Sequence, residues 1–124
     1  MKRAALSLML CVGAAPALAY TAQDAATCAA FNFANWDYEV QHFSAEDRSP
    51  GWKQQAADFV LVAERLGQDK NTTARIIKAE RGALLELING FVFDDKPTTK
   101  RTFEKLSRSC NRIIRKAPEM KAHR

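Results

Sequence analysis

The clearest candidates for chemistry are five basic side chains that recur near the end of the chain. Residues 99–117 read as a helix, and helical spacing places two separate stripes on it. One stripe is apolar and must face a core: Phe103, Leu106, Cys110, Ile113 and Ala117. The other, the basic stripe, lies about 200° around the axis: Arg101, Lys105, Arg108, Arg112 and Arg115. Such a row of cations predicts an anionic partner.

The basic stripe has two interpretations. Like charges one turn apart repel each other by a few tenths of a kcal/mol, and Arg101, near the start of the helix, opposes the helix dipole. Because an anionic partner would offset this repulsion, the stripe favours contact with an acidic protein, an anionic component of the cell envelope or an acidic polymer. The alternative is a stripe that is solvated, or paired within the chain with Glu39, Glu46 or Glu86.

Patterns that could support catalysis are missing from the sequence. The histidines, His42 and His123, belong to opposite ends of the expected fold and cannot act as a pair. The sequence contains no CxxC, CxxCH or GxSxG motif, no zinc-ligand spacing and no glycine-rich phosphate loop. We therefore expect a protein that is not an enzyme and that uses neither a metal nor a cofactor.

Glu80 is a carboxylate that the helical pattern places on an apolar face. It falls between Ile76 and Leu84 in a helix expected at residues 71–91. An unpaired buried carboxylate is costly, so Glu80 should be paired or protonated. One alternative is a bond to an arginine, a tryptophan N–H or a backbone group. The other is a carboxyl group with a raised pKa that acts as a pH sensor.

A second contact surface is predicted on the first helix, at residues 22–43. Its inward stripe is predicted to be Ala22, Ala25, Ala29, Phe33, Trp36, Val40 and Phe43. The opposite side carries Phe31, Asn35, Tyr38 and His42. Two aromatic side chains on an outer face, Phe31 and Tyr38, indicate a contact there. It could be a homodimer interface, a partner protein, or the tail of the chain folded back.

The sequence predicts four helices, at about residues 22–43, 52–66, 71–91 and 99–117. Thr21 with Asp24 forms a capping pair, Gly67 ends the second helix and Pro118 ends the fourth. Short connections favour an all-α, antiparallel up-down-up-down four-helix bundle. In that topology five aromatic residues gather at one end, as part of the core or as a docking pocket: Phe43, Trp52, Phe91, Phe93 and Phe103.

Cys28 and Cys110 are the cysteines that remain after the first 19 residues. In the expected bundle each lies about two turns from a helix end at the same pole, so the two are level. An even pair in an oxidising compartment is typical of a disulfide. The alternative is two free buried thiols.

Residues 1–19 have the pattern of a signal peptide. Lys2 and Arg3 precede an apolar run, and Ala17-Leu18-Ala19 is a small-x-small cleavage site. We expect cleavage after Ala19, loss of Cys11 with the leader, and a periplasmic or secreted chain. It would consist of a four-helix domain at 20–117 and a flexible tail at 118–124. The alternative, an anchoring transmembrane helix, needs a longer apolar run.

Charge is unevenly distributed along the chain. The net charge is +5, and residues 96–124 hold ten basic and two acidic residues, whereas residues 20–95 are net acidic. An exported chain of small net charge does not suit nucleic acid as a partner. We expect a non-enzymatic binding protein of the cell envelope, of inhibitor or immunity type, that contacts a protein through the basic stripe.

The mature chain resembles the small acid-stress chaperones of the bacterial periplasm in its length, its expected export, its helicity and its long-range cysteine pair, Cys28 and Cys110. The similarity is one of plan. The chain shares no motif with those proteins, which carry their cysteines closer together. The resemblance implies an alternative function, a chaperone that opens at low pH and exposes an aromatic core.

Overall fold

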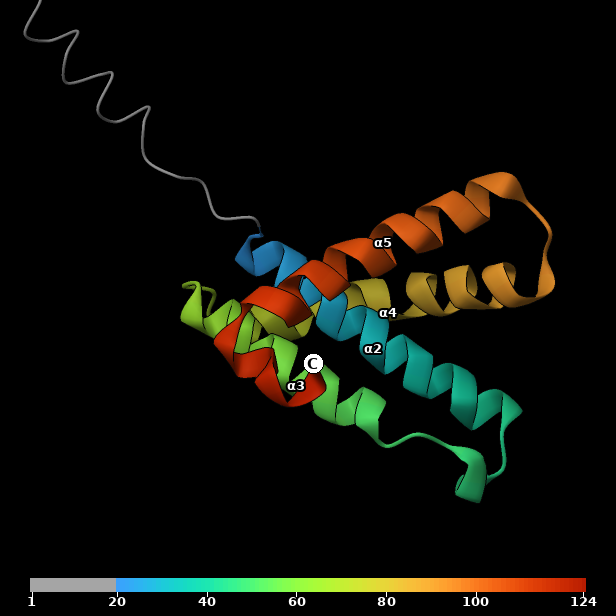
Figure 1. Cartoon of the computed structure of the whole chain (residues 1–124), viewed down its shortest axis with the longest axis horizontal. Coiled ribbons are helices and arrows are strands. Elements are labelled where there is room, and N and C mark those ends of the chain that lie inside the picture. The colour runs from blue at the N-terminus through green and yellow to red at the C-terminus, as the bar shows by residue number, and fades with distance from the viewer. Residues whose placement is uncertain (1–19) are drawn as a thin grey trace, which may run out of the picture.

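The computed structural model of the protein describes residues 20–124, so the expected signal peptide and Cys11 lie outside the described residues. This part of the chain is helical, with no strand (Figure 1). Its elements are α2 (Ala22–His42), η1 (Ala45–Asp47), α3 (Gly51–Arg65), α4 (Lys70–Phe93), α5 (Pro97–Lys116) and η2 (Pro118–His123). The predicted all-α class is confirmed. Among these helices, none combines the length and the apolar character needed to cross a membrane.

Local sequence signals set the start of α2 and the end of α3. Thr21 and Asp24 form the predicted capping box, in which each backbone N–H donates to the other side chain, at 2.9 and 3.1 Å. After α3, Gly67 adopts a left-handed φ of 98°. This turn lets the Gln68 N–H donate to the carbonyl of Ala63 at 3.1 Å, which satisfies a free carbonyl at the helix end.

The last two helices begin earlier than predicted. Asp69 caps α4, because its side chain accepts a hydrogen bond from the Thr72 N–H at 2.9 Å. The bonds from Thr72 lower the pKa of Asp69. α5 begins at Pro97, whose fixed φ suits the first turn of a helix.

α2 is the central element of the fold. It packs along both α3 and α4, which contact each other far less (Figure 1). The first half of α2 carries small side chains, which allow neighbouring helices to approach closely. These alanines are completely buried: Ala25, Ala26, Ala29, Ala30 and Ala34.

The burial of α2 corrects the predicted inward stripe. Phe31, predicted on the outer side, is 6% exposed, whereas Val40 and Phe43, predicted inward, are each 42% exposed. Phe33 is half-buried, with the guanidinium of Arg81 4.8 Å from its ring centroid. The prediction assumed a single core face. Because α3, α4 and α5 all pack on α2, more than one of its faces is covered.

A disulfide between Cys28 and Cys110 joins α2 to α5, as predicted. Both cysteines are buried, and Ile113, one turn further along α5, is buried with them. The part of α5 that precedes this anchor contacts α4 and begins at the turn that connects the two helices (Figure 1). The antiparallel up-down-up-down order of the helices stays a prediction.

The last residues form the 3₁₀ segment η2, which packs against α3 and α5, and so correct the prediction of a flexible tail. Met120 is completely buried. Glu119 pairs with Arg65, and His123 Nε2 lies 2.7 Å from Asp58 Oδ2. Arg124 donates to two carbonyls at the end of α5, at 2.8 and 2.9 Å. The prediction treated Pro118 as the end of ordered structure, but the chain turns there and docks.

Candidate functional site

The basic stripe lies on α5, and its five side chains are all exposed: Arg101, Lys105, Arg108, Arg112 and Arg115. None of them takes part in the ion pairs that connect residues 20–124. Glu39, a predicted internal partner of the stripe, is instead buried. It accepts hydrogen bonds from Trp52 of α3 and from Ser49 in the loop before α3. Glu46 and Glu86 are exposed and pair with none of the five. Pairing of the stripe with other side chains of residues 20–124 is therefore not observed, and the stripe faces solvent.

Phe31 and Tyr38, predicted as contact residues, make their contacts within the protein. Phe31 meets Phe103 of α5 edge-on, with ring centroids 5.5 Å apart, and Phe91 of α4 stacks on Phe103 at 3.8 Å. Tyr38 is half-buried, with its ring 4.4 Å from that of His42. The predicted role of Phe31 in partner binding is corrected, because α5 covers this side chain.

The five aromatic residues expected at one end of the bundle do not form a single cluster. Phe43 and Phe93 flank Tyr38, with centroid distances of 6.1 and 6.4 Å. They are 42% and 63% exposed, so this end of the molecule presents aromatic surface to solvent. The stacked pair described above lies apart from them, and Trp52 belongs to neither group.

Glu39 is the buried carboxylate of the described residues, at 8% exposure. It accepts a hydrogen bond from the Ser49 N–H and another from Trp52 Nε1, the latter at 2.6 Å. These bonds fasten the loop after α2, and the start of α3, to α2. This role was not predicted from the sequence.

Glu80 is half-buried rather than fully buried. Its carboxylate accepts a hydrogen bond of 2.7 Å from the Thr27 hydroxyl, which joins α4 to α2. Of the two alternatives for Glu80, the structure supports a paired carboxylate. Its partner is a hydroxyl group, which the sequence analysis did not name.

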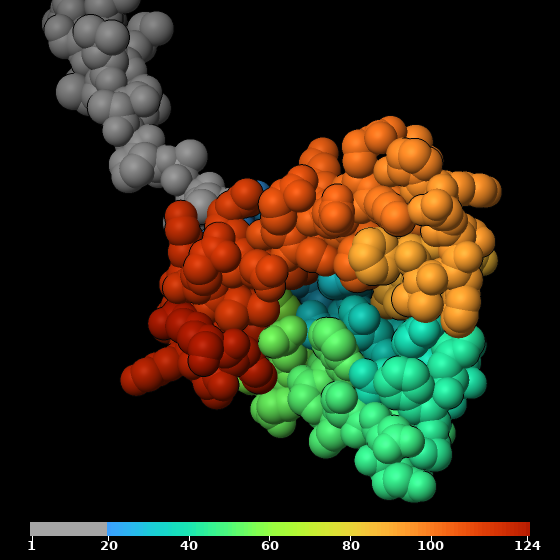
Figure 2. Space-filling model, turned by 45° about the vertical axis from the view of Figure 1, so that its right-hand side comes forward, coloured from blue at the N-terminus to red at the C-terminus, as the bar shows by residue number. Residues whose placement is uncertain are grey.

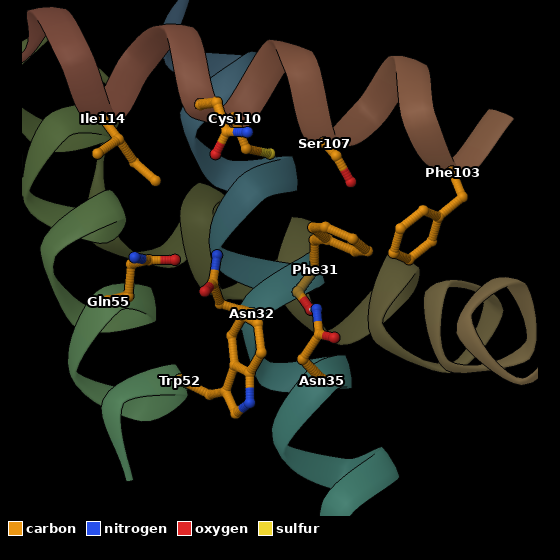
Figure 3. A pocket seen from close by; sticks show the side chains of 10 residues that line it. Phe31, Asn32, Asn35, Trp52, Gln55, Phe103, Ser107, Cys110 and Ile114 are labelled. Atoms are coloured by element: carbon orange, nitrogen blue, oxygen red, sulfur yellow. The ribbon is translucent and has the colours of Figure 1, made fainter. Parts of the chain in front are cut away.

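A pocket of about 160 Å³ opens between α3 and α5, with α2 at its floor. Figure 2 shows the hollow, where α2 is visible between the two outer helices. We call it the amide pocket because four of its side chains are amides, and Figure 3 labels three of them, Asn32, Asn35 and Gln55. It is lined by Phe31, Asn32, Asn35, Trp52, Gln55, Phe103, Ser107, Cys110, Asn111 and Ile114. None of these side chains is charged.

Two asparagines of α2 present oxygen atoms at the floor of the amide pocket. Asn32 Nδ2 donates to the Cys28 carbonyl at 2.8 Å, and Asn35 Nδ2 donates to the Phe31 carbonyl at 2.9 Å. Each amide is thereby fixed with its nitrogen toward the helix. Asn32 is 2% exposed, and its Oδ1 has no hydrogen-bond partner. The sequence analysis overlooked Asn32, although it is a polar residue within an alanine-rich stretch.

The candidate metal ligands of residues 20–124 are dispersed over the fold. Within residues 20–124 no three histidine, cysteine, aspartate or glutamate side chains are placed to share a metal ion. His42 lies 3.0 Å from an Asn89 oxygen, and His123 pairs with Asp58, so the two histidines serve separate contacts. No family model, curated protein or solved structure matches the chain, so its basic stripe and amide pocket are the basis for assigning a function.

Proposed function

We propose that this protein is a small non-enzymatic binding protein, of inhibitor or immunity type, that contacts an acidic partner protein through the basic stripe of α5. The observation that carries the proposal is the row of five exposed cations with no carboxylate partner in the described structure. A row of like charges is unfavourable for an isolated helix, so contact with an acidic surface would remove a repulsion as well as add attraction.

The anchoring of α5 supports this role. The disulfide at Cys110 and the buried side chain of Ile113 fix the inner side of the helix, which leaves the basic stripe on the outer side. A fixed helix holds its charges in register at little cost in entropy on binding. The proposal includes cleavage after Ala19, a periplasmic or secreted location, and an antiparallel four-helix order. It does not require a homodimer.

Reversing the charge of the basic stripe should weaken binding to an acidic polypeptide. The probe is fluorescein-labelled poly-L-glutamate, and the readout is fluorescence anisotropy at low and moderate salt. The test variant carries Arg101→Glu, Arg108→Glu and Arg112→Glu. We expect its Kd to rise about tenfold or more, which corresponds to about 1.4 kcal/mol, and the native affinity to fall with added salt.

The matched control reverses three exposed cations on α4, so that net charge changes equally: Lys70→Glu, Arg75→Glu and Lys78→Glu. We expect this variant to keep an affinity within about twofold of the native protein, since local charge decides binding at these distances. An equal loss in both variants would show that net charge alone drives binding and would discard the basic stripe as a site.

A second candidate function, an acid-responsive chaperone, is favoured by the contact that holds the tail. Burial raises the pKa of Glu119, but the hydrogen bond and charge of Arg65 outweigh this, so the pKa lies below its ordinary value of 4.5. The unfolded chain therefore takes up the proton first as the pH falls. The stabilisation from this contact is complete above about pH 4.5 and is lost as the pH falls through the folded pKa.

Acid should loosen the tail and increase binding of a hydrophobic dye between about pH 4.5 and pH 2. Glu119→Gln removes the titrating group, so this variant should be less stable at neutral pH, by about 1 kcal/mol or less for a partly exposed pair. Its stability should change less across the acid range than that of the native chain. The control Glu104→Gln alters an exposed glutamate that forms no ion pair, and should titrate like the native chain. A native chain that binds no dye at any of these pH values removes the chaperone candidate.

A further inference from the structure

We propose that the amide pocket binds a single neutral sugar ring. The inference goes beyond the proposed function, because most of the residues of α5 that line the pocket lie on a different side of the helix from the basic stripe. Phe103, Ser107 and Ile114 follow one another at helical spacing on the inner side. A ligand in the amide pocket can therefore be gained or lost independently of a partner on the basic stripe.

The unpaired Oδ1 of Asn32 indicates a hydrogen-bond donor in the ligand. A buried carbonyl oxygen without a hydrogen bond is costly, and such groups in native proteins normally have a partner. The Asn32 side chain lies in the middle of the pocket, between Gln55 and Phe31 (Figure 3). Its nitrogen is already bonded to the Cys28 carbonyl. The missing partner must therefore be a donor, which a hydroxyl group of a ligand supplies.

The lining of the pocket is uncharged. Its ten residues carry no ionisable side chain, because Cys110 is held in the disulfide. A charged ligand group would lose its hydration without gaining an opposite charge, which is unfavourable. The ligand is therefore neutral, and it binds through hydrogen bonds and apolar contact.

The pocket is small and has polar groups on three sides. Its volume of about 160 Å³ suits one six-membered ring. Polar side chains surround the space from three helices, with Asn32 and Asn35 on α2, Gln55 on α3, and Ser107 and Asn111 on α5. Hydroxyl groups spread around a sugar ring match this arrangement, whereas a flat base presents its polar atoms on its edge alone.

The aromatic side chains of the pocket are fixed in place and suit a sugar ring better than a flat ligand. Phe31 and Phe103 meet edge-on, at an interplanar angle of 71°, so they do not form the parallel walls that a flat aromatic ligand needs. Trp52 contributes to the lining, and its Nε1 is held by Glu39, which fixes the indole before a ligand arrives. Apolar faces of a sugar ring pack well on such side chains, and preorganisation reduces the entropic cost of binding.

The test is a titration of the oxidised mature chain, residues 20–124. Two-dimensional proton–nitrogen correlation NMR monitors the backbone and side-chain amides at each ligand concentration. The probes are the methyl glycosides of glucose, galactose and N-acetylglucosamine, with adenosine and N-acetylglycinamide as neutral ligands of other classes. We expect at least one glycoside to give saturable shifts at the side chains of Asn32, Asn35, Gln55 and Asn111. A Kd in the millimolar range is expected for one ring.

Two variants on the same helix decide whether the pocket is the site. Ser107→Leu fills the pocket, whereas Ser109→Leu adds the same side chain outside it. We expect Ser107→Leu to raise the Kd about tenfold or more, and Ser109→Leu to leave it unchanged. Asn32→Leu removes the unpaired oxygen at similar volume and should weaken binding while the protein remains folded.

Three outcomes overturn the proposal. Binding of adenosine or the amide without any glycoside would assign the pocket to another ligand class. Glycoside binding that survives Ser107→Leu would place the sugar elsewhere on the surface. Binding of no probe at all would mean that the pocket holds water alone.

Discussion

Replacing both Cys28 and Cys110 with alanine is expected to lower the free energy of unfolding by about 4 kcal/mol. The disulfide joins residues separated by 82 positions, so its loss frees a long loop in the unfolded chain. It also removes the covalent attachment of α5 to α2. Urea denaturation followed by circular dichroism measures the change, and the slope should rise because the unfolded chain becomes more expanded.

Reduction of the native protein with dithiothreitol serves as the control for the cysteine substitutions. The reduced protein and the double-alanine variant should lose similar stability, since both lack the crosslink. A loss below about 1 kcal/mol in the variant, with an unchanged slope, would contradict this account. It would mean that buried side chains such as Ile113 and Met120 hold α5 in place without the disulfide.

Replacing Glu39 with alanine is expected to lower the free energy of unfolding by about 3 kcal/mol, because two N–H groups lose a charged acceptor. Those groups are the Ser49 backbone N–H and Trp52 Nε1. The loop between α2 and α3 should loosen, and the indole N–H resonance of Trp52 should move upfield. Urea denaturation and proton NMR provide the two readouts.

Glu46 offers a matched control for Glu39, because it is an exposed glutamate in η1 of the same loop region. Glu46→Ala should change stability by less than about 0.5 kcal/mol. Equal effects of the two substitutions would show that overall charge, rather than the two hydrogen bonds, explains the loss. Glu39→Ala should also disturb the lining of the amide pocket, since Trp52 both lines the pocket and donates to Glu39.

The features that could be predicted from sequence depend on neighbours along the chain. Thr21 with Asp24 carries a complete helix start within four residues, and Gly67 supplies the left-handed turn that ends α3. The disulfide between Cys28 and Cys110 joins distant residues and was predictable for another reason, because an even pair of cysteines in a chain expected to be exported is typical of a disulfide. The basic stripe was equally visible, since helical spacing determines which side chains share a face.

The features that could not be predicted depend on which element covers which face. Helical periodicity predicted one inward stripe on α2. The alanine-rich part of this helix does not indicate how many other helices pack on it. Phe31 was therefore placed outside, although α5 covers it. Docking of the tail depends on Glu119 and Arg65, which are far apart in the chain. The amide pocket likewise exists because α3 and α5 meet across α2.

The central claim, that the basic stripe recognises an acidic partner protein, is tested most directly by affinity capture at low salt. The baits are the oxidised native chain and the two charge-reversed variants, on α5 and on α4, exposed to an extract of the cells that produce the protein. We predict that one acidic protein is retained by the native chain and by the α4 variant, and is lost with the α5 variant. Retention of the same protein by the α5 variant, or retention of none by the native chain, would contradict the account.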